Sequence, residues 1–498
     1  MEENIKLEYE PRNGWTCLDE NTLKELEAFC EDYKRFLDDA KTERESTEVL
    51  VNTAKEAGFS DLNDYLCAKK KARPGTKLYA VNRGKSCAFI IIGKNDPVLG
   101  MNMLGAHIDA PRLDFKPKPI YEDSGYALAK THYYGGIKKY QWVATPLALH
   151  GVVFLEGGRK VSVRIGEDES DPVLYITDLL PHLAQDQMVK NGYSLIGAEQ
   201  LNVTLASRPV LDFEQCDKDG ACCSNSDGCC EGEKKEEKEK EEKADKSVKK
   251  AVLKLLYDKY GICEKDFFRA EFEIVPAAKA KDVGIDRALV GAYAQDDRVC
   301  AYTGFRSLLD LKEIPEKTAV VYLSDKEEIG SVGNTGARSC WLENLCLELV
   351  SNYDPSYGML ELRRAMTATK FLSADVTAAF DPNFPEVSDK LNVAFASNGI
   401  SFNKYTGSHG KSGASDASPE FISYVIDTLE KENIPWQLTE MGKVDIGGGG
   451  TIAQFMADLG MEVLDCGVPV LSMHSPFEVT SKADVYWTYR AYMAFIKA

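Results

Sequence analysis

The chain of 498 residues has no run of about 18 apolar residues, the length that an apolar helix needs to cross a bilayer. Its first residues, Met1–Lys6, are charged and lack the apolar segment of a secretory signal. We therefore expect a cytoplasmic protein that does not bind to membranes.

The chain also has fewer basic than acidic residues. Asp and Glu outnumber Lys and Arg by 79 to 60, so the formal net charge is -19. A surface of that sign repels both nucleic acid and anionic lipid. The composition therefore argues against nucleic acid and membranes as partners.

The cysteines do not form a pattern that requires disulfides. Most of the 14 are scattered, and several lie among apolar neighbours, as reduced buried thiols do. Five others fall between Cys216 and Cys230, at separations of six, one, six and one that differ from zinc-knuckle spacing. The run Glu231–Lys250 is then nearly all Glu and Lys. We interpret 214–250 as a solvated segment that extends away from the folded domain. A metal site within it is the alternative.

The length of the chain and the pattern of its helix-like and strand-like segments predict two domains. A hydrophobic content of 44% indicates a globular protein, and 498 residues exceed one ordinary core. Residues 113–267 contain short strand-like pieces separated by many turns, whereas helix-like and strand-like segments alternate from 268 to 498. We expect an α/β domain made of 1–112 and 268–498, interrupted by a β-rich domain at 113–267.

The first part of the α/β domain has two clear local patterns. Apolar residues between Asn21 and Ala57 recur at helical spacing. Lys77–Val81 and Ser86–Gly93 have strand composition and flank a turn at Asn82–Gly84, which predicts a hairpin.

The stretch Val320–Ser331 is the most informative in the chain. Val320–Leu323 has the composition of a buried strand, and Ile329–Ser331 turns the chain. Glu327 and Glu328 therefore follow a strand's carboxyl end, where open α/β sheets bind ligands. One carboxylate can bind a metal while the other faces a water. Taken alone, the pair is equally explained as solvated surface acids.

Four further polar clusters lie at strand ends or turns: His107–Asp109, Gln295–Arg298, Ser373–Val376 and Ser472–Ser475. With Glu327 and Glu328 they supply the His, Asp and Glu ligands of two divalent metals that share a carboxylate. Each cluster alone fits a structural histidine or an ion pair. Their repetition at successive strand ends favours a two-metal site. Asp109 is suited to accept the second imidazole proton of His107.

Such a site suits amide hydrolysis. Two cations polarise a carbonyl and lower the pKa of a water, while a free carboxylate takes its proton. Gly448 and Gly449, within the run Gly447–Gly450, offer backbone N–H groups for substrate or an oxyanion. A plain loop is the alternative for that run.

Six polar segments stand out together, namely Gly105–Arg112, Asp296–Arg298, Glu327–Ser331, Ser373–Asp375, Asp381–Asn383 and Met473–Ser475. As a set they resemble the M18, or aspartyl aminopeptidase, family of metallo-aminopeptidases. The likeness covers nearly the whole chain apart from about 214–250. It implies a three-layer α/β/α zinc-peptidase-like catalytic domain with the β-rich insertion as dimerisation domain.

The resemblance also implies which residues hold two divalent metal ions per subunit, zinc first, with manganese or cobalt as alternatives. In this sequence the ligands are His107 and Asp375 for one ion, Glu328 and His474 for the other, and Asp296 between them. It further implies that Glu327 is the general base, that Asp109 orients His107, and that the Asp296–Asp297 peptide is cis.

His182 lies in Pro181–Ala184, which resembles the family segment whose histidine reaches a neighbouring subunit's active site. By that resemblance His182 helps to hold the tetrahedral intermediate in trans. The family assembles as dimers gathered into tetrahedral dodecamers that admit short peptides. An ordinary surface histidine is the alternative.

Substrate preference is left open by the sequence. Lys404 and Lys411 lie where the family has part of its specificity pocket, and either can pair with an acidic N-terminal side chain. Surface lysines are the alternative, because 399–420 aligns only loosely with the family pattern.

Two other functions are compatible with these residues. A carboxypeptidase or acyl-amino-acid deacylase would use the same metals on another substrate. A non-catalytic metal-binding assembly protein would explain the cysteine-rich segment.

Overall fold

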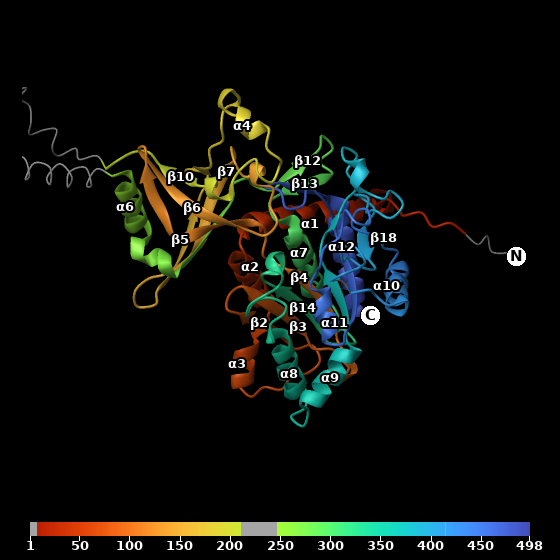
Figure 1. Cartoon of the computed structure of the whole chain (residues 1–498). Helices are drawn as coiled ribbons and strands as arrows, with labels where there is room; N and C mark the ends of the chain where they lie inside the picture. The colour runs from red at the N-terminus through yellow and green to blue at the C-terminus, as the bar shows by residue number, and fades with distance from the viewer. Residues whose placement is uncertain (1–6, 211–246, 414) are drawn as a thin grey trace, which may run out of the picture. The chain divides into compact units, whose positions relative to one another are not determined.

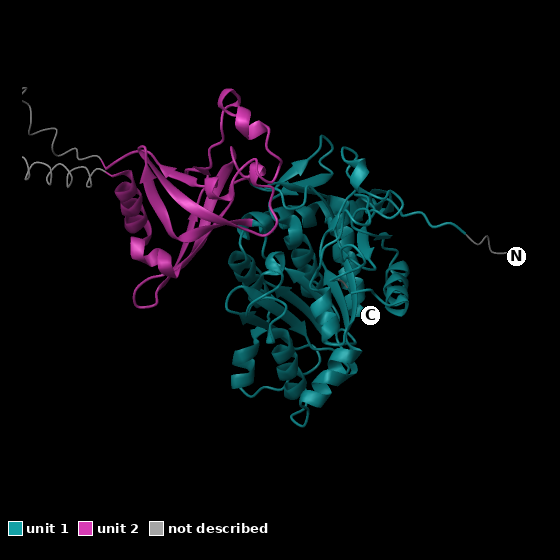
Figure 2. Cartoon of the chain, viewed as in Figure 1, with its two compact units in different colours: residues 1–111, 279–498 teal, residues 112–278 magenta. Residues whose placement is uncertain are grey.

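The computed structural model describes residues 7–210, 247–413 and 415–498. It divides into two compact units, one of residues 1–111 and 279–498 and the other of 112–278 (Figure 2). The cysteine cluster and most of the Glu/Lys run lie outside the described residues.

A nine-stranded sheet forms the centre of the first unit (Figure 1). Its strand order is β1 (Ser60–Asp61), β2 (Lys77–Asn82), β3 (Ser86–Ile91), β14 (Ala319–Ser324), β4 (Asn102–His107), β15 (Lys370–Ala374), β19 (Glu462–Gly467), β17 (Ile400–Asn403) and β18 (Trp436–Thr439). The central strands β14, β4, β15 and β19 are parallel to their neighbours in that group. Their carboxyl ends therefore meet at one edge.

Helices cover both faces of this sheet. One buried cluster contains residues of α1 (Glu20–Asp39), α2 (Glu43–Glu56), α7 (Gln295–Leu309), α10 (Pro419–Lys431) and α12 (Lys482–Lys497). The other contains residues of α3 (Leu62–Cys67), α8 (Trp341–Tyr353), α9 (Met359–Ala368) and α11 (Ala453–Asp458). The three-layer α/β/α class expected from the sequence is confirmed.

Strand β14 shows why these strands are apolar throughout. Val321 and Leu323 belong to the first buried cluster, whereas Val320 and Tyr322 belong to the second. Successive side chains point to opposite faces, and both faces are covered. The expected buried strand at Val320–Leu323 is confirmed.

The local predictions near the N-terminus also hold, with one refinement. Strands β2 and β3 pair antiparallel as a hairpin. The helical pattern from Asn21 to Ala57 becomes two helices, because Thr42 and Glu45 form a capping box that starts α2.

A small sheet beside the main one consists of β12 (Lys281–Val283), β13 (Leu289–Ala292), β21 (Glu478–Ser481), β20 (Pro469–Leu471) and β16 (Thr377–Ala378). Its strands β20 and β21 flank the segment that contains His474, and β13 precedes α7.

The second unit is built on a seven-stranded sheet. Its strand order is β11 (Ala270–Pro276), β5 (Arg112–Asp123), β6 (Tyr126–Tyr134), β10 (Val203–Ala206), β9 (Leu174–Tyr175), β7 (Pro146–Phe154) and β8 (Lys160–Ile165), and β11 also pairs with β7. Helices α4 (Gln185–Met188) and α6 (Val248–Tyr260) accompany it. Across the described ranges of both units, every helix is too short or too polar to span a bilayer.

Close packing between β4 and β15 gives a test of the core. A Cβ at Gly105 would lie 2.1 Å from Cζ of Phe371, so the G105A substitution should destabilise the protein by about 1–3 kcal/mol. At Gly304 the nearest atom to a Cβ is 3.7 Å away, and G304A in α7 is the matched control. Thermal unfolding should show a lower midpoint for G105A only. Equal midpoints for the two variants would contradict this packing.

Candidate active site

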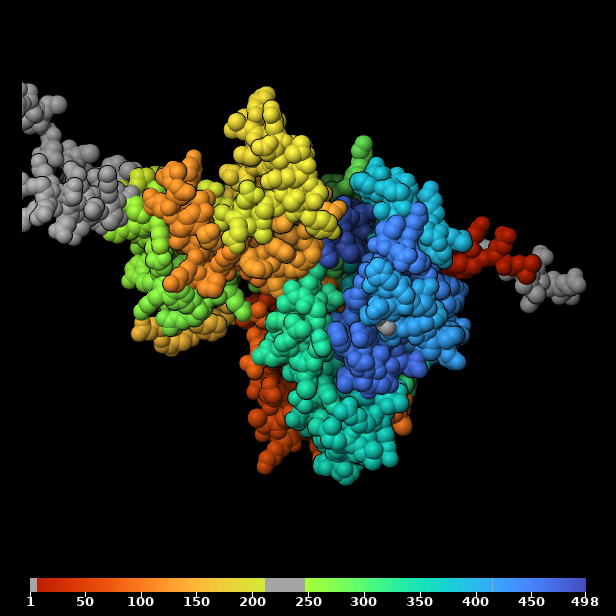
Figure 3. Space-filling model, viewed as in Figure 1, coloured from red at the N-terminus to blue at the C-terminus, as the bar shows by residue number. Residues whose placement is uncertain are grey.

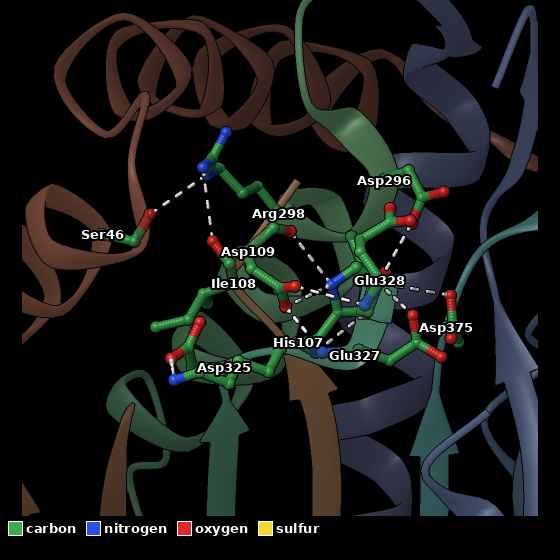
Figure 4. A network of polar contacts seen from close by, with 12 residues as sticks. Ser46, His107, Ile108, Asp109, Asp296, Arg298, Asp325, Glu327, Glu328 and Asp375 are labelled. Atoms are coloured by element: carbon green, nitrogen blue, oxygen red, sulfur yellow. Dashed lines mark hydrogen bonds and ion pairs between the residues drawn. The ribbon is translucent and has the colours of Figure 1, made fainter. Parts of the chain in front are cut away.

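The polar clusters meet at the carboxyl edge of the central strands (Figure 4). His107 is the last residue of β4, Asp375 follows β15, and Glu327 and Glu328 lie in the turn after β14. Asp296 stands in the first turn of α7, before the residues with helical backbone angles. Because β4, β14 and β15 are parallel, these side chains come from neighbouring positions of one edge.

Asp296 lies between two imidazoles. Its Oδ1 is 3.1 Å from Nε2 of His107, and its Oδ2 is 3.1 Å from Nε2 of His474. Burial would raise the pKa of Asp296, but the hydrogen bonds with the two histidines outweigh it and hold the pKa below its usual value. The peptide between Asp296 and Asp297 is cis.

Two groups of ligand atoms share this carboxylate. One consists of His107, Asp296 and Asp375, the other of Asp296, Glu328 and His474, with the atoms of each group within 4.8 Å of one another. The five residues are those that the sequence analysis assigned as metal ligands. They come from five separate segments of the chain.

The donor set fits divalent metal ions. Burial first, and then neighbouring carboxylates, raise the pKa values of Glu328 and Asp375 well above the usual range. Oε1 of Glu328 is buried and makes no hydrogen bond within the described residues, although Nε2 of His474 lies 3.5 Å away. Cations would supply the missing countercharge, and imidazole with carboxylate suits zinc, manganese and cobalt.

Glu327 belongs to neither group, and its side chain is 16% exposed. Its Oε2 lies 3.8 Å from Nε2 of His107. Burial is the largest cause that raises the pKa of Glu327 to about 7; the charge of His107 opposes it, and that of Asp109 adds to it. A carboxyl group with a pKa near neutrality can both accept and return a proton.

Asp109 makes the contact expected with His107 and two that were not expected. Its Oδ1 is 3.3 Å from Nδ1 of His107, and its backbone carbonyl is 3.0 Å from the same nitrogen. Its carboxylate also accepts the backbone N–H groups of Glu327 at 3.0 Å and Glu328 at 3.2 Å. One buried side chain thus connects the end of β4 to the turn after β14.

The site opens into a cleft of about 500 Å³. Its lining includes Glu327, His474, Gly448 and Gly449. Gly448 has φ +112°, and a Cβ there would lie 2.5 Å from the carbonyl oxygen of Gly407, so only glycine fits. The N–H of Gly449 donates to Thr406 at 3.2 Å.

Lys404 and Lys411 both lie beside Asp416. Both ammonium groups pair with Asp416, Lys411 at 3.1 Å. Among the described residues neither lysine lines the cleft itself, but Lys411 lines a smaller hollow that shares Thr406, Met441 and Gly448 with the cleft.

His182 lies in the second unit, in the short turn Pro181–Leu183, where it is exposed. The segment around α4 stands out from the surface of this unit as the yellow stretch in Figure 3.

Two buried polar residues beside the site were given no functional role from the sequence. From the sequence, Arg298 was interpreted as an ion-pair partner. In the structure its buried guanidinium donates to Ser46 at 3.1 Å and to the carbonyl oxygen of Ile108 at 3.3 Å (Figure 4). Glu478 is 1% exposed and accepts the backbone N–H groups of both Asp296 and His474. Burial, and then the charge of Asp296, raise its pKa to about 8. Its place four residues after His474 was the only signal in the sequence.

Comparison with known proteins extends the likeness to the whole chain. The family model described as aminopeptidase I zinc metalloprotease (M18) matches residues 36–496. A probable M18 family aminopeptidase 1 from Clostridium acetobutylicum is 46% identical over 496 residues, which is 100% of both chains. The one from Thermotoga maritima is 40% identical over 493 residues, 99% of this chain and 100% of that protein.

Solved structures agree in fold. The crystal structure of the M18 aminopeptidase from Thermotoga maritima superposes with a TM-score of 0.87 at 40% identity, covering 98% of this chain and 100% of that one. Aminopeptidase I from Clostridium acetobutylicum gives 0.86 at 44% identity, covering 99% and 100%. The S. cerevisiae mApe1 dodecamer gives 0.71 at 20% identity, covering 94% and 96%, a likeness of fold alone.

Proposed function

Because the chain belongs to the M18 family of zinc metallo-aminopeptidases, we propose that it removes N-terminal residues from short peptides with two divalent metal ions that share Asp296. The observation that carries the proposal is the position of Asp296, whose two oxygens each lie 3.1 Å from a different imidazole. A single carboxylate so placed is suited to bridge two ions.

We assign His107 and Asp375 to one ion and Glu328 and His474 to the other. The two ligand groups around Asp296 support this division. Zinc is the first choice because the family model describes zinc metalloproteases. Manganese and cobalt accept the same donors.

In the proposed mechanism the metal ions and the side chains of the protein have different roles. The two ligand groups around Asp296 would hold the ions, which would supply polarisation of the scissile carbonyl and a water of lowered pKa. Glu327 accepts the proton of that water and delivers it to the leaving nitrogen. The carboxylate of Asp109 accepts the backbone N–H of Glu327 and so keeps that residue in place. The backbone carbonyl of Asp109 lies against Nδ1 of His107 and fixes the tautomer of the imidazole. Gly448 lets its loop pack directly against the backbone of Gly407 in the wall of the cleft, beside which the substrate would bind.

For substrate preference, the described lining of the cleft argues against an acidic first residue. It contains no Lys or Arg, and Lys404 and Lys411 are already paired with Asp416. We therefore propose that neutral N-terminal residues are removed faster than Asp or Glu. An acidic preference would require one of the two lysines to leave Asp416.

We further propose that the second unit is the dimerisation domain, that the dimers gather into a tetrahedral dodecamer, and that the protein acts in the cytoplasm. Large apolar side chains of the second unit are exposed around His182, namely Leu183 at 69%, Met188 at 71%, Val189 at 85% and Tyr193 at 89%. Apolar surface of this kind is typical of a protein interface. His182 would then act at a neighbouring subunit's site.

Replacing Glu327 by Gln should lower kcat by about 10²–10⁴, because the amide cannot accept the proton of the attacking water. Metal content, measured by elemental analysis, should stay at the wild-type value, since Glu327 belongs to neither ligand group. E348Q, on the exposed face of α8, is the control and should keep full activity. Wild-type turnover in E327Q would remove the assigned role.

A panel of peptides that begin with Leu, Ala, Lys, Asp or Glu should show the highest kcat/KM for Leu and Ala with zinc, manganese or cobalt. Blocking the amine of the best substrate should abolish cleavage, and blocking its carboxyl group should not. Faster cleavage of Asp and Glu peptides would instead assign Lys404 or Lys411 to the substrate. A requirement for a free carboxyl group would favour the carboxypeptidase alternative.

H182A should lose most of its activity while it keeps its metal ions. Co-expression of H182A with E327Q should restore part of the activity, because a mixed dimer contains one site with Glu327 and a partner's His182. K190A, at a neighbouring exposed position, is the control. Fully active isolated monomers, or a mixture that stays inactive, would show that His182 does not act in trans.

A further inference from the structure

We propose that Glu478 is the positioning residue of the metal centre and that its carboxylate sets the relative position of Asp296 and His474. The proposal rests on the two-metal function above. Glu478 belongs to neither ligand group, so it acts through the residues that it holds.

The carboxylate of Glu478 has one oxygen for each of these residues. Oε1 accepts the backbone N–H of His474 at 2.7 Å, and Oε2 accepts that of Asp296 at 3.0 Å. Asp296 and Glu478 are 182 positions apart in the sequence. A single buried side chain thus joins the residue shared by the two groups to a ligand of the second.

Neither held residue is fixed by regular secondary structure. Asp296 has φ -80° and ψ 107°, outside the helical range, although it lies in the first turn of α7. His474 has φ +64° and lies in the turn between β20 and β21. The hydrogen bonds to Glu478 therefore supply orientation that the helix and strand ladders do not.

Glu478 is itself firmly placed. Its backbone lies in β21 opposite Ala292 of β13. Its carbonyl oxygen accepts Nε2 of Gln295 at 2.7 Å, and Oε1 of Gln295 accepts the hydroxyl of Tyr33 at 3.2 Å. The segment that carries Asp296 is thus attached to β21 both through Gln295 and through the Glu478 carboxylate.

A displacement of Asp296 affects both ions, because each of its oxygens faces a different histidine. Loss of the Glu478 carboxylate should therefore weaken retention of the two ions together. Loss of a residue that touches only one group should weaken one ion first. This difference separates a positioning role from a simple loss of one ligand.

The test compares the E478Q variant with a matched control. Asp484 in α12 is also a fully buried carboxylate with two backbone N–H partners, Ser397 at 2.6 Å and Gly399 at 2.8 Å, but it contacts no residue of the ligand groups in the described structure. D484N removes the same kind of interaction elsewhere. Full-length zinc-loaded proteins are treated with graded EDTA, and the zinc retained per chain is measured by elemental analysis.

For E478Q the chelator concentration that removes half of the zinc should fall about 10–100-fold, with both ions lost in one step. D484N should retain zinc as the wild type does, even if its thermal midpoint is lower. The E478D variant keeps the carboxyl group on a side chain shorter by one methylene, and it should lie between wild type and E478Q. It also supplies the comparison if E478Q does not fold.

Unchanged zinc retention in both Glu478 variants would overturn the inference, and so would an equal loss in D484N. Wild-type protein that retained no zinc would instead contradict the proposed two-metal function. The two failures are thus distinguishable.

Discussion

The contact on which the rest of the site depends is the one between Asp296 and the two imidazoles. A buried carboxylate with a histidine on each oxygen fixes the distance between two ligand groups. Asp375 lies in one of these groups and Glu328 in the other. Without cations, burial and mutual repulsion disfavour the ionised forms of Glu328 and Asp375. Bound cations would offset this cost, in agreement with the zinc metalloprotease family to which the chain belongs.

The fold makes this contact possible through a few structural elements. Parallel strands β4, β14 and β15 bring His107, the Glu327–Glu328 turn and Asp375 to one edge. The start of α7 and the segment between β20 and β21 supply Asp296 and His474 from outside the main sheet. Asp109 and Glu478 then connect these segments by accepting backbone N–H groups, so that the ligands rest on a hydrogen-bonded frame.

The sequence could predict which residues form the two candidate ligand groups, because residues that can bind metals have a restricted chemistry and here follow apolar strands. Val320–Leu323 followed by Glu327 and Glu328 is visible without a structure, and so is a histidine directly after the apolar run that ends in His107. The residues that hold these segments in place were harder to predict from the sequence. Glu478 and Arg298 act through bonds to backbone atoms far away in the chain, and a side chain that holds a distant N–H has no local signature. The same holds for Lys404 and Lys411, whose pairing with Asp416 depends on how one loop folds back. The segment 214–246 lies outside the described residues, so the expectation that it is solvated and extends away from the domain stays a prediction.

The central claim is that Asp296 is shared by two metal ions. Anomalous diffraction from crystals of the zinc-loaded protein, recorded at the zinc absorption edge, tests it most directly. We expect two peaks per chain, each about 2.0–2.2 Å from a different oxygen of Asp296. One peak should lie near His107 and Asp375, and the other near Glu328 and His474. A single peak, or a pair that leaves Asp296 out of contact, would contradict the account.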